Sequence, residues 1–505
     1  MIQKIVFILL LLISFTANAK FDWLEPVKIE DIFLKKHISI VFASQNLKSP
    51  VSMFGHTFLV IHAETIPEPD SIVIEFLGKT DGVSWAHLKA LVSYIEGEYR
   101  LTRFILKKRE YDLEDRNLWI YRLSLSENEK EKLIYNISNN LKKKNLPYTF
   151  LNQNCSHYIL KLLLYEKKQN SQFLLYTLPK YTIRELQQLG YIATPPTNIH
   201  STQFFLIKKF NELNSQDKKN VAKIINANNT YNSQNTTPTL KKIASLAIAY
   251  KTPRESNPQI RNHYFNTQKK ILAELNEKNL VSLSEPLKNN SYDPLKLFGD
   301  TSLRFGILTK TRGLVLEGKL AQRDFYTSLN DGLSSSYLEI LKTKIVTNDL
   351  GINISQFTIF KLDSLVSEHD YRLPFNRLFD LSFYNHNYEF NKNIGECVAR
   401  YGYGTSWNYS DLTLGIIPYF GVRYFNNSSK TIELDLGITG KINYWINDYI
   451  STEASMIKYL NSKMPFNYLL ELKFAIRINP RWTLGVQNIF YAKNSNMEFS
   501  MVYNF

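Results

Sequence analysis

The chain has 505 residues, and its hydrophobic fraction of 44% is enough to build ordinary cores, so disorder is not expected. Its 61 Lys and Arg residues against 46 Asp and Glu residues give a formal net charge of +15, which suits anionic partners but equally a generally basic proteome. Only two cysteines occur, Cys155 and Cys397, which excludes a disulfide-dense scaffold.

The first predicted element is a secretory signal over residues 1–19. Lys4 precedes an apolar run that ends at Phe15, and the small residues Ala17 and Ala19 are typical of a cleavage site. An exported chain seldom meets nucleic acid, so nucleic acid is not an expected partner. No later stretch approaches the roughly 18 apolar residues of a membrane-spanning helix, so any insertion into a membrane must use another architecture.

Residues 20–200 are expected to form one α+β domain. Short runs rich in β-branched and aromatic residues predict neighbouring strands at 37–44, 54–63 and 71–77. A further strand near residue 119 leads into an amphipathic helix, for which Ser126 and Glu129 form a capping box. A loop follows, and then a helix with an apolar face that begins at Cys155.

Residues 201–295 are expected to be a helical connecting region. Its Asn- and Thr-rich segment 226–239 predicts a linker or an exposed loop. Apolar residues then recur at helical spacing from Ile243 to Tyr250 and from Ile260 to Leu275. Such stripes are more often core than binding sites, so we expect this region to contribute packing and no chemistry.

From residue 296 to 505 the pattern changes to the alternation of a β-strand. It is clearest over residues 432–444, where apolar residues alternate with Glu433, Asp435 and Lys441. The same alternation recurs at 468–478 and 497–505. A continuous apolar face therefore lies opposite a charged one.

These long strands favour a transmembrane β-barrel over a soluble β-sandwich. Strands of soluble proteins average about 5 to 6 residues, whereas a tilted strand that crosses a bilayer needs about 9 to 11. About 200 residues at roughly 17 per strand and turn predict a C-terminal antiparallel barrel of about 12 strands, an even number as in closed bacterial barrels. Cys397 would lie on its apolar face, and the terminal Phe505 resembles the last residue of bacterial outer-membrane proteins.

Cys155 is the candidate nucleophile. A helix N-terminus and a neighbouring histidine both lower the pKa of a thiol, and Cys155 is expected to have the first. His56, which follows a glycine at a predicted strand start, is the best-placed histidine. Free cysteine is also common as buried packing, so a role without chemistry stays open. No metal site is expected, because His56 and His62 lack a familiar ligand spacing.

Three segments, in order, carry a resemblance to a known family: "FASQNLKSPVSMFGHTFLVI", "REYDLEDRNLWIYRLSLSENE" and "LPYTFLNQNCSHYILKLL". They resemble the Lnb-type N-terminal periplasmic domain over about residues 30 to 200. The histidine precedes the cysteine, as in the circularly permuted papain-like fold of lecithin:retinol acyltransferase and its bacterial relatives. The family is associated with lipoprotein N-acylation and also occurs fused to a β-barrel, so the resemblance implies a periplasmic domain attached to the outer membrane.

The resemblance implies that Cys155 is the catalytic nucleophile and His56 its general base. For the third group, which holds the imidazole, Glu75 is our choice, because this carboxylate stands between apolar neighbours in the following strand; an exposed strand residue would show the same pattern. Tyr148 and Asn154 could position the substrate carbonyl, and loop packing or helix capping would explain them equally well. The Cys155 backbone amide is a candidate oxyanion donor.

The expected function is acyl transfer or hydrolysis in two steps through a thioester on Cys155, with no cofactor. The resemblance implies a phospholipid donor and a lipoprotein amine acceptor. A peptidoglycan amidopeptidase that cuts wall peptides is an alternative. So is a barrel whose periplasmic domain only binds a partner.

Overall fold

The protein is described by a computed structural model. The described residues are 32, 36–45, 54–79, 93–164, 177–192, 195–226, 237–274, 293–294, 301–310, 312–323, 325–326, 336–348, 351–365, 376–385, 395–409, 411–426, 431–447, 449–460, 468–479, 481–491 and 494–505. The predicted signal segment 1–19 and most of the predicted linker, at 227–236, lie outside them.

The chain divides into two compact units, Met1–Leu295 and Lys296–Phe505. The first contains a mixed sheet-and-helix fold and a group of helices, and the second is built from strands. Among the described residues, no helix is both long enough and apolar enough to cross a membrane.

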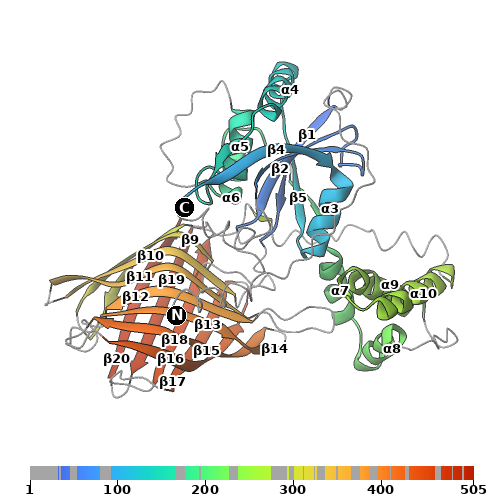
Figure 1. Ribbon diagram of the computed structural model, residues 1–505. Helices are drawn as coiled ribbons and strands as arrows, with labels where there is room; N and C mark the ends of the chain where they lie inside the picture. Colours follow the sequence, from blue (N-terminus) through green and yellow to red (C-terminus); the bar gives the residue numbers. More distant parts are fainter. Residues whose placement is uncertain are drawn as a thin grey trace. The chain divides into compact units, whose positions relative to one another are not determined.

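The first unit is built around a seven-stranded antiparallel sheet with the order β6-β4-β3-β2-β1-β5-β7 (Figure 1). The strands are His37–Ala43 (β1), His56–His62 (β2), Ile72–Gly78 (β3), Ile95–Arg103 (β4), Leu118–Arg122 (β5), Leu146–Tyr148 (β6) and Thr197–Ile199 (β7). The predicted strands at 37–44, 54–63 and 71–77 correspond to β1, β2 and β3, which lie side by side as expected.

Helices cover both faces of this sheet. On one face, α4 (Glu127–Leu141), α5 (Cys155–Leu163) and α6 (Pro179–Gln188) pack on a core that includes Leu59 and Ile74. On the other face, α3 (Phe104–Leu113) packs on Phe58 and Val60. Because successive side chains of a strand point to opposite faces, a strand covered on both sides is apolar along its whole length.

The structure confirms the two predicted helix starts, after Ser126 and at Cys155. Ser126 caps α4: its hydroxyl accepts a hydrogen bond from the Glu129 backbone N–H, while the Glu129 carboxylate accepts one from the Ser126 backbone N–H. This is the predicted capping box. Cys155 is the first residue of α5, so its thiol lies at a helix N-terminus.

The connecting region is helical, as predicted. It contains α7 (Thr202–Asn211), α8 (Ser215–Asn226), α9 (Pro238–Lys251), the short 3₁₀ helix η3 (Thr252–Arg254) and α10 (Pro258–Glu274). Ile243 and Tyr250 of α9 are buried, as are Tyr264 and Ile271 of α10. Ile260 is the exception: it lies in the first turn of α10 and is exposed, so that end of the predicted stripe does not pack. Leu275 lies outside the described residues.

The second unit consists of long antiparallel strands. They are Ser302–Leu308 (β8), Leu314–Arg323 (β9), Tyr337–Asn348 (β10), Gly351–Ser364 (β11), Arg377–Asn385 (β12), Gly395–Tyr403 (β13), Thr405–Tyr409 (β14), Leu412–Asn426 (β15), Ile432–Trp445 (β16), Ile450–Tyr459 (β17), Tyr468–Asn479 (β18), Trp482–Tyr491 (β19) and Asn494–Asn504 (β20). Each pairs with its neighbour in sequence, except that β13 and the short β14 lie end to end along one edge of β15.

The sheet closes on itself because β20 pairs with β8. Counting β13 and β14 as one position, the ring has 12 strands, which confirms the predicted barrel and strand number and excludes a β-sandwich. The order around the ring is β8 to β13, then β15 to β20, so β10 and β17 lie on opposite walls.

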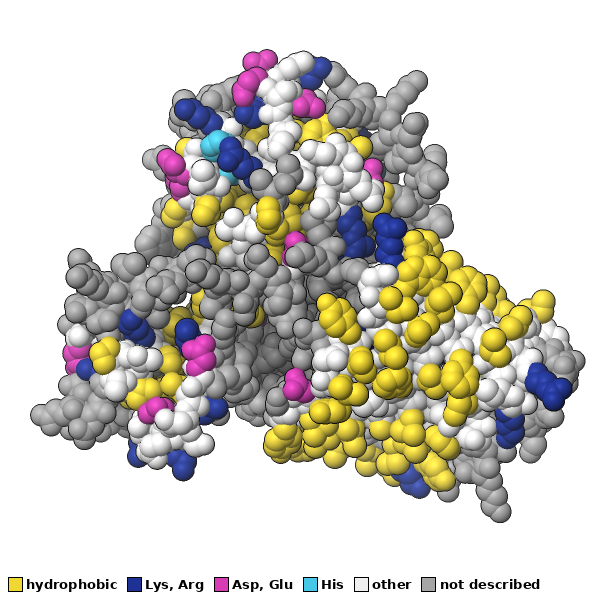
Figure 2. Space-filling view, turned by 180° about the vertical axis from the view of Figure 1, so that it is seen from behind, with side chains coloured by type: hydrophobic (Ala, Val, Ile, Leu, Met, Phe, Trp, Pro, Cys, Tyr) yellow, Lys and Arg dark blue, Asp and Glu magenta, His cyan; other side chains and the backbone are white. Residues whose placement is uncertain are grey.

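The polarity of the barrel is the reverse of that of a soluble protein. Outward side chains such as Ile432, Leu434 and Phe499 are apolar and exposed, whereas inward ones such as Asp435 and Glu498 are buried. Figure 2 shows hydrophobic side chains gathered over the outer surface of the barrel strands. An exposed apolar surface of this extent, formed by strands without a free edge, is suited to lipid and identifies the barrel as a membrane-spanning domain.

Candidate functional site

The site begins with the capped N-terminus of α5. Asn154 precedes the helix, and its side-chain oxygen accepts hydrogen bonds from the backbone N–H groups of Ser156 (3.0 Å) and His157 (3.3 Å). Among the hydrogen bonds of the described residues, none uses the Cys155 backbone N–H as donor. The Cys155 side chain itself is 4% exposed, so the thiol lies in a largely dry environment.

His56 is brought to this point by the chain entry into β2. Gly55, immediately before it, has φ +89°, a conformation that L side chains rarely adopt. A Cβ atom at Gly55 would also lie 2.5 Å from the Phe42 ring and 2.8 Å from the Ala43 carbonyl oxygen. Glycine is therefore required where β2 begins, and the backbone direction that it sets fixes the start of the His56 side chain.

Cys155 and His56 are in hydrogen-bonding contact, and each changes the pKa of the other. Burial disfavours the imidazolium, but the Cys155 sulfur and the Glu75 carboxylate outweigh burial and raise the pKa of His56 to about 9. Burial likewise disfavours the thiolate, but His56, with smaller contributions from Thr57 and Ser156, lowers the pKa of Cys155 to about 7. Between these two values the pair exists as thiolate and imidazolium.

Glu75 lies behind the imidazole. It projects from β3, the neighbour of β2, and its Oε2 is 3.8 Å from His56 Nε2, an ion-pair distance that is longer than a hydrogen bond. The carboxylate is 3% exposed, and the positive charges of His56 and of the Lys107 ammonium outweigh burial and lower its pKa. His56 therefore lies between a thiol and a buried anion.

Lys107 is the second cation at this carboxylate. Its ammonium, on α3, is 2.8 Å from Glu75 Oε2 and 2.7 Å from Glu110 Oε2. The side chain is 6% exposed, so this is a buried ion-pair network in which every charge needs its partner. The Tyr111 ring lies beside it, 5.6 Å from Nζ, and also beside the His56 ring.

Two hydroxyl groups surround the sulfur. Thr57 Oγ1 lies 3.9 Å from Cys155 Sγ, and Ser156 Oγ lies 3.8 Å from it. The two hydroxyls are also 3.1 Å apart, within hydrogen-bond distance of each other. The Thr57 backbone N–H and the Ser156 hydroxyl favour the ionised sulfur and lower the pKa of Cys155, because each can donate a hydrogen bond to a thiolate.

The two predicted substrate-positioning residues also lie near the thiol. Both groups of the Asn154 amide have partners in the fold: besides capping α5, its nitrogen donates to the Phe150 carbonyl (2.9 Å) and the Thr177 carbonyl (2.6 Å). Tyr148 is 7% exposed and stacks on Phe76. Burial raises the pKa of Tyr148, and the negative charge of the nearby Cys155 sulfur raises it further. A positioning role for either residue stays a prediction.

Three other histidine and cysteine residues do not contact His56 in this way. His62, at the far end of β2, has both ring nitrogens in use, one with Ser39 Oγ (2.8 Å) and one with the Glu64 carbonyl (2.7 Å). His157 follows the thiol on α5 and packs against Tyr158. Cys397 is an exposed free thiol on the barrel strand β13, so no disulfide joins it to Cys155. Within the described residues, no group of three or more His, Cys, Asp or Glu side chains could hold a metal ion.

Sequence reasoning missed Lys107, Thr57 and Ser156. Thr57 carries a signal that could have been used: in a strand it must face away from His56 and toward the helix that follows the sheet. Ser156 could have been suggested by its place beside Cys155. Lys107 lies in the charged run "LKKRE", which is typical of a solvated helix face, so nothing in the sequence marks it as buried.

The fold and the site together define a class: a membrane-spanning β-barrel protein with an N-terminal sheet-and-helix domain that holds a Cys-His pair. Residues 27–188 match the family model described as the Lnb N-terminal periplasmic domain. This confirms the predicted resemblance, and the protein is an outer-membrane protein that joins a periplasmic Lnb-type domain to a 12-strand barrel.

Solved structures similar to the chain cover its barrel. The NanC porin is 11% identical with a TM-score of 0.26, covering 41% of this chain and 98% of the porin. The KdgM porin in complex with disordered oligogalacturonate is 8% identical with a TM-score of 0.26 and the same coverage. The outer membrane protein Omp33 of Acinetobacter baumannii is 10% identical with a TM-score of 0.23, covering 42% and 100%. Among curated proteins, none matches the chain.

Proposed function

We propose that the periplasmic domain is a cysteine-dependent acyltransferase or hydrolase that works through a thioester on Cys155. The observation that carries the proposal is the buried Cys155–His56 pair, in which the pKa of the thiol falls to about 7 and that of the imidazole rises to about 9. A thiolate next to an imidazolium is the reactive form of a cysteine nucleophile. A cysteine that served only as packing would gain nothing from a charged neighbour.

The first step forms the acyl-enzyme. The Cys155 sulfur attacks the carbonyl carbon of an ester, a C–S bond forms, and the carbonyl oxygen becomes an oxyanion. The Cys155 backbone N–H is the candidate donor to that oxygen. The intermediate then collapses, the C–O bond to the alcohol breaks, and His56 gives its proton to the departing oxygen. The products are a thioester on Cys155, a free alcohol and a neutral His56.

The second step releases the acyl group. An amine or water attacks the thioester carbon while His56 removes a proton from it. The C–S bond breaks, the sulfur leaves as a thiolate, and the pair returns to its starting charges. Glu75 acts through His56 and not on the substrate: its fixed negative charge, 3.8 Å from Nε2, holds the ring and stabilises the imidazolium.

A phospholipid is the proposed acyl donor, and a lipoprotein amine the proposed acceptor. Two features support the donor: the barrel anchors the chain in a membrane, and the motifs of the domain resemble a group associated with lipoprotein N-acylation. The net charge of +15 also suits an anionic lipid surface.

The experiment is an intact-mass measurement of the full-length protein after incubation with phospholipid vesicles at pH 8, inside the range where both charges of the pair are present. The expected result is a mass increase of one acyl chain that hydroxylamine removes. Cys155→Ala should give no adduct. Cys397→Ala is the matched control, because it deletes the other thiol of the chain and should leave the adduct unchanged.

An adduct that survives in Cys155→Ala, or disappears in Cys397→Ala, would refute the assignment of Cys155. If neither protein forms an adduct with phospholipid, the same preparation is incubated with peptidoglycan. Cys155-dependent release of wall peptides would then identify the domain as an amidopeptidase. No reaction with either substrate would leave a binding domain as the function.

A further inference from the structure

We infer that the lumen of the barrel is closed to water and solutes, so that this domain anchors the chain in the membrane and does not conduct. The lumen is defined here as the space enclosed by the inward-facing side chains of β8–β20. The inference rests on the packing of those side chains and is independent of the thiol chemistry.

The first observation is that many of the charged residues inside the barrel are buried. Arg423 and Glu453 are each 1% exposed, and Asp435 and Arg477 are each 2% exposed. In a water-filled channel, charged side chains on the wall would be in contact with water and would therefore be exposed. Here they are covered by one another, as in a packed core.

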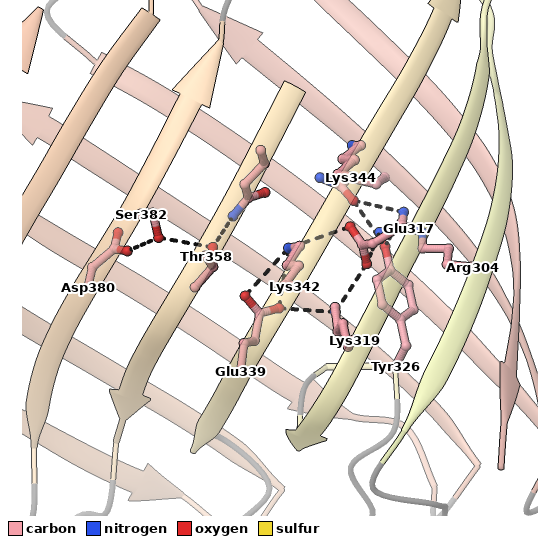
Figure 3. Close-up of polar contacts among 12 residues, drawn as sticks. Arg304, Glu317, Lys319, Tyr326, Glu339, Lys342, Lys344, Thr358, Asp380 and Ser382 are labelled. Atoms are coloured by element: carbon pink, nitrogen blue, oxygen red, sulfur yellow. Dashed lines mark hydrogen bonds and ion pairs between the residues drawn. The ribbon is translucent and has the colours of Figure 1, made fainter. Parts of the chain in front are cut away.

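The second observation is a lattice of ion pairs over the wall formed by β8, β9 and β10 (Figure 3). Glu317 is surrounded by cations: Lys319 at 3.2 Å, Lys342 at 3.5 Å and Arg304 at 3.9 Å. Lys319 also binds Glu339 at 3.0 Å, so the charges of neighbouring strands are linked in a chain. Paired charges of this kind can be held without water, whereas a single buried charge cannot.

The third observation is that several contacts cross the lumen. Tyr337 of β10 donates a hydrogen bond to Glu453 of β17 on the opposite wall at 2.5 Å. The Asn443 amide of β16 donates to the Tyr337 hydroxyl at 2.8 Å. Lys441 of β16 pairs with Asp363 of β11 at 2.5 Å. These bridges join walls that a pore would have to keep apart.

The fourth observation is that two residues between β9 and β10, Phe325 and Tyr326, lie inside the barrel. Phe325 and Tyr326 are buried with Ala475 and Val502 of the barrel wall. The Tyr326 hydroxyl accepts from Arg304 at 3.2 Å, and Thr483 donates to the Tyr326 carbonyl at 3.1 Å. These two residues fill space that the strands alone would leave.

A glycine in the barrel wall leaves space for the Tyr326 ring. A Cβ atom on Gly485 of β19 would lie 2.5 Å from the Tyr326 ring, which only glycine avoids. Arg477 of β18 donates to the Phe325 carbonyl, so Phe325 and Tyr326 are held by their backbone as well as by their rings. The barrel is thus closed by its own chain.

A second set of charges closes another part of the lumen. Arg400 binds Asp435 at 2.7 Å and Asp380 at 3.4 Å. Arg423 binds Asp435 at 2.7 Å and Glu396 at 3.1 Å. Each guanidinium therefore joins carboxylates from two strands, so these charges are paired with one another across neighbouring strands.

The first test measures permeability. Full-length protein is reconstituted in liposomes that contain entrapped potassium salt and a small sugar, and its incorporation is measured by flotation. The expected efflux of both solutes equals that of empty liposomes. Protein-dependent efflux of either solute would overturn the inference.

The second test measures water access to one inward position. Thr439 lies inward on β16 and is 7% exposed, and Asn447 lies in the turn that follows β16. In a Cys155→Ala, Cys397→Ala background, each is replaced by cysteine and treated with a charged, water-soluble thiol reagent. Thr439→Cys should react at least about 100-fold more slowly than Asn447→Cys, because reaction must await local opening.

Both cysteines should react equally after unfolding in detergent, which shows that the thiol itself is competent. Equal rates in the folded protein would mean that water reaches the middle of the lumen, and the inference would fail. A slow Thr439→Cys together with silent liposomes supports a closed anchor.

Discussion

His56 presents Nε2 to the carboxylate of Glu75 at a distance of 3.8 Å, across two neighbouring strands of the sheet. The same carboxylate oxygen binds Lys107 at 2.8 Å. One buried anion therefore serves two cations, and the charge on the imidazole depends on a lysine that never touches it. The sign of that dependence can be measured.

The reactivity of Cys155 should follow its lowered pKa. In a Cys397→Ala background, alkylation of Cys155 by iodoacetamide should rise through a midpoint near pH 7, because His56 lowers the thiol pKa to about 7 from its ordinary 9.0. In His56→Asn the midpoint should move above 9, because burial, the largest influence on this thiol, then outweighs the smaller effects of Thr57 and Ser156. At pH 7 the rate in His56→Asn should fall by at least about tenfold, measured as the modified fraction by mass spectrometry. Equal midpoints in the two proteins would contradict the pairing.

Glu75→Gln and Lys107→Met should move the titration of the pair in opposite directions. Removing the anion lowers the pKa of both His56 and Cys155, since the imidazolium loses its partner and the thiolate loses a repelling neighbour. Removing the lysine raises both. The expected pKa shifts are about 1 unit each, read from the pH dependence of Cys155 alkylation. Lys107→Arg keeps the positive charge and should leave the alkylation profile unchanged. If Glu75→Gln and Lys107→Met shift the pKa values in the same direction, the network has a purely structural role.

The same network predicts a stability pattern. Glu75→Gln leaves Lys107 buried beside Glu110 alone, so the domain should lose about 3 to 5 kcal/mol of unfolding free energy. The double variant Glu75→Gln, Lys107→Met removes both charges and should recover most of that loss. Pulse proteolysis in urea, read on the N-terminal unit of the full chain, measures both values. A double variant no more stable than Glu75→Gln would contradict the ion-pair account.

Asn154→Ala should destabilise α5 more than an ordinary cap substitution. An N-cap replacement costs about 1 kcal/mol, and here the loss of the two donations to Phe150 and Thr177 adds to it. Asn154→Ser keeps a capping oxygen and should lose less. If acyl-adduct formation falls in step with stability across the two variants, Asn154 acts by capping. A rate that falls in Asn154→Ser at nearly unchanged stability would show that Asn154 positions the substrate.

Tyr148→Phe removes the hydroxyl group and keeps the aromatic ring, so it tests the role of the hydroxyl alone. The ring packs on Phe76 in the domain core, so stability should change by less than about 1 kcal/mol. If the hydroxyl helps to position the carbonyl, the rate of adduct formation should fall about tenfold while the Cys155 alkylation profile is unchanged. An unchanged adduct rate would leave Tyr148 with packing alone.

Stability should depend little on the titration of the pair itself. His56 stabilises the fold below its ordinary pKa of 6.5, and that contribution is lost as pH rises through about 9. Cys155 stabilises it above 9.0, and that contribution is lost as pH falls through about 7. Between pH 7 and 9 the two slopes have opposite signs and nearly cancel.

His56→Asn removes this cancellation. In the folded variant, the buried Cys155 thiol stays protonated above pH 9. In the unfolded variant the same thiol has lost its proton, so the free energy of unfolding should fall by up to about 1.4 kcal/mol per pH unit above pH 9. The measured quantity is the difference between the variant and the native protein from pH 8 to 10, by the same proteolysis assay. A constant difference would contradict the raised pKa expected for the isolated thiol.

Much of the fold was predictable because its periodicities are strong. The alternation over 432–444 continues through the whole of β16, and the charged positions Asp435 and Lys441 lie inward as expected of a barrel. Ser126 and Glu129 located the start of α4 because a capping box is a local signal. Ile260 shows the limit of such reasoning: a helical stripe does not reveal how far the neighbouring helix extends over it.

The site was predictable only in part. Cys155 and His56 were singled out by a helix start, a glycine and an order of motifs, and the fold brings the two together. Glu75 lies beside the imidazole because adjacent antiparallel strands place diagonal neighbours on one face. Lys107 could not be predicted, since its burial depends on how α3 packs over the sheet, which no local pattern records.

The pairing of β8 with β20 has a consequence for how the protein is made. Ser302 pairs with Asn504, so the ring stays open until the last strand of the sequence has found the first. The sheet that holds Cys155 and His56 pairs only strands between His37 and Ile199. Biogenesis can therefore complete the thiol site as a separate and earlier event, and a chain stalled before insertion would already carry Cys155 and His56 side by side.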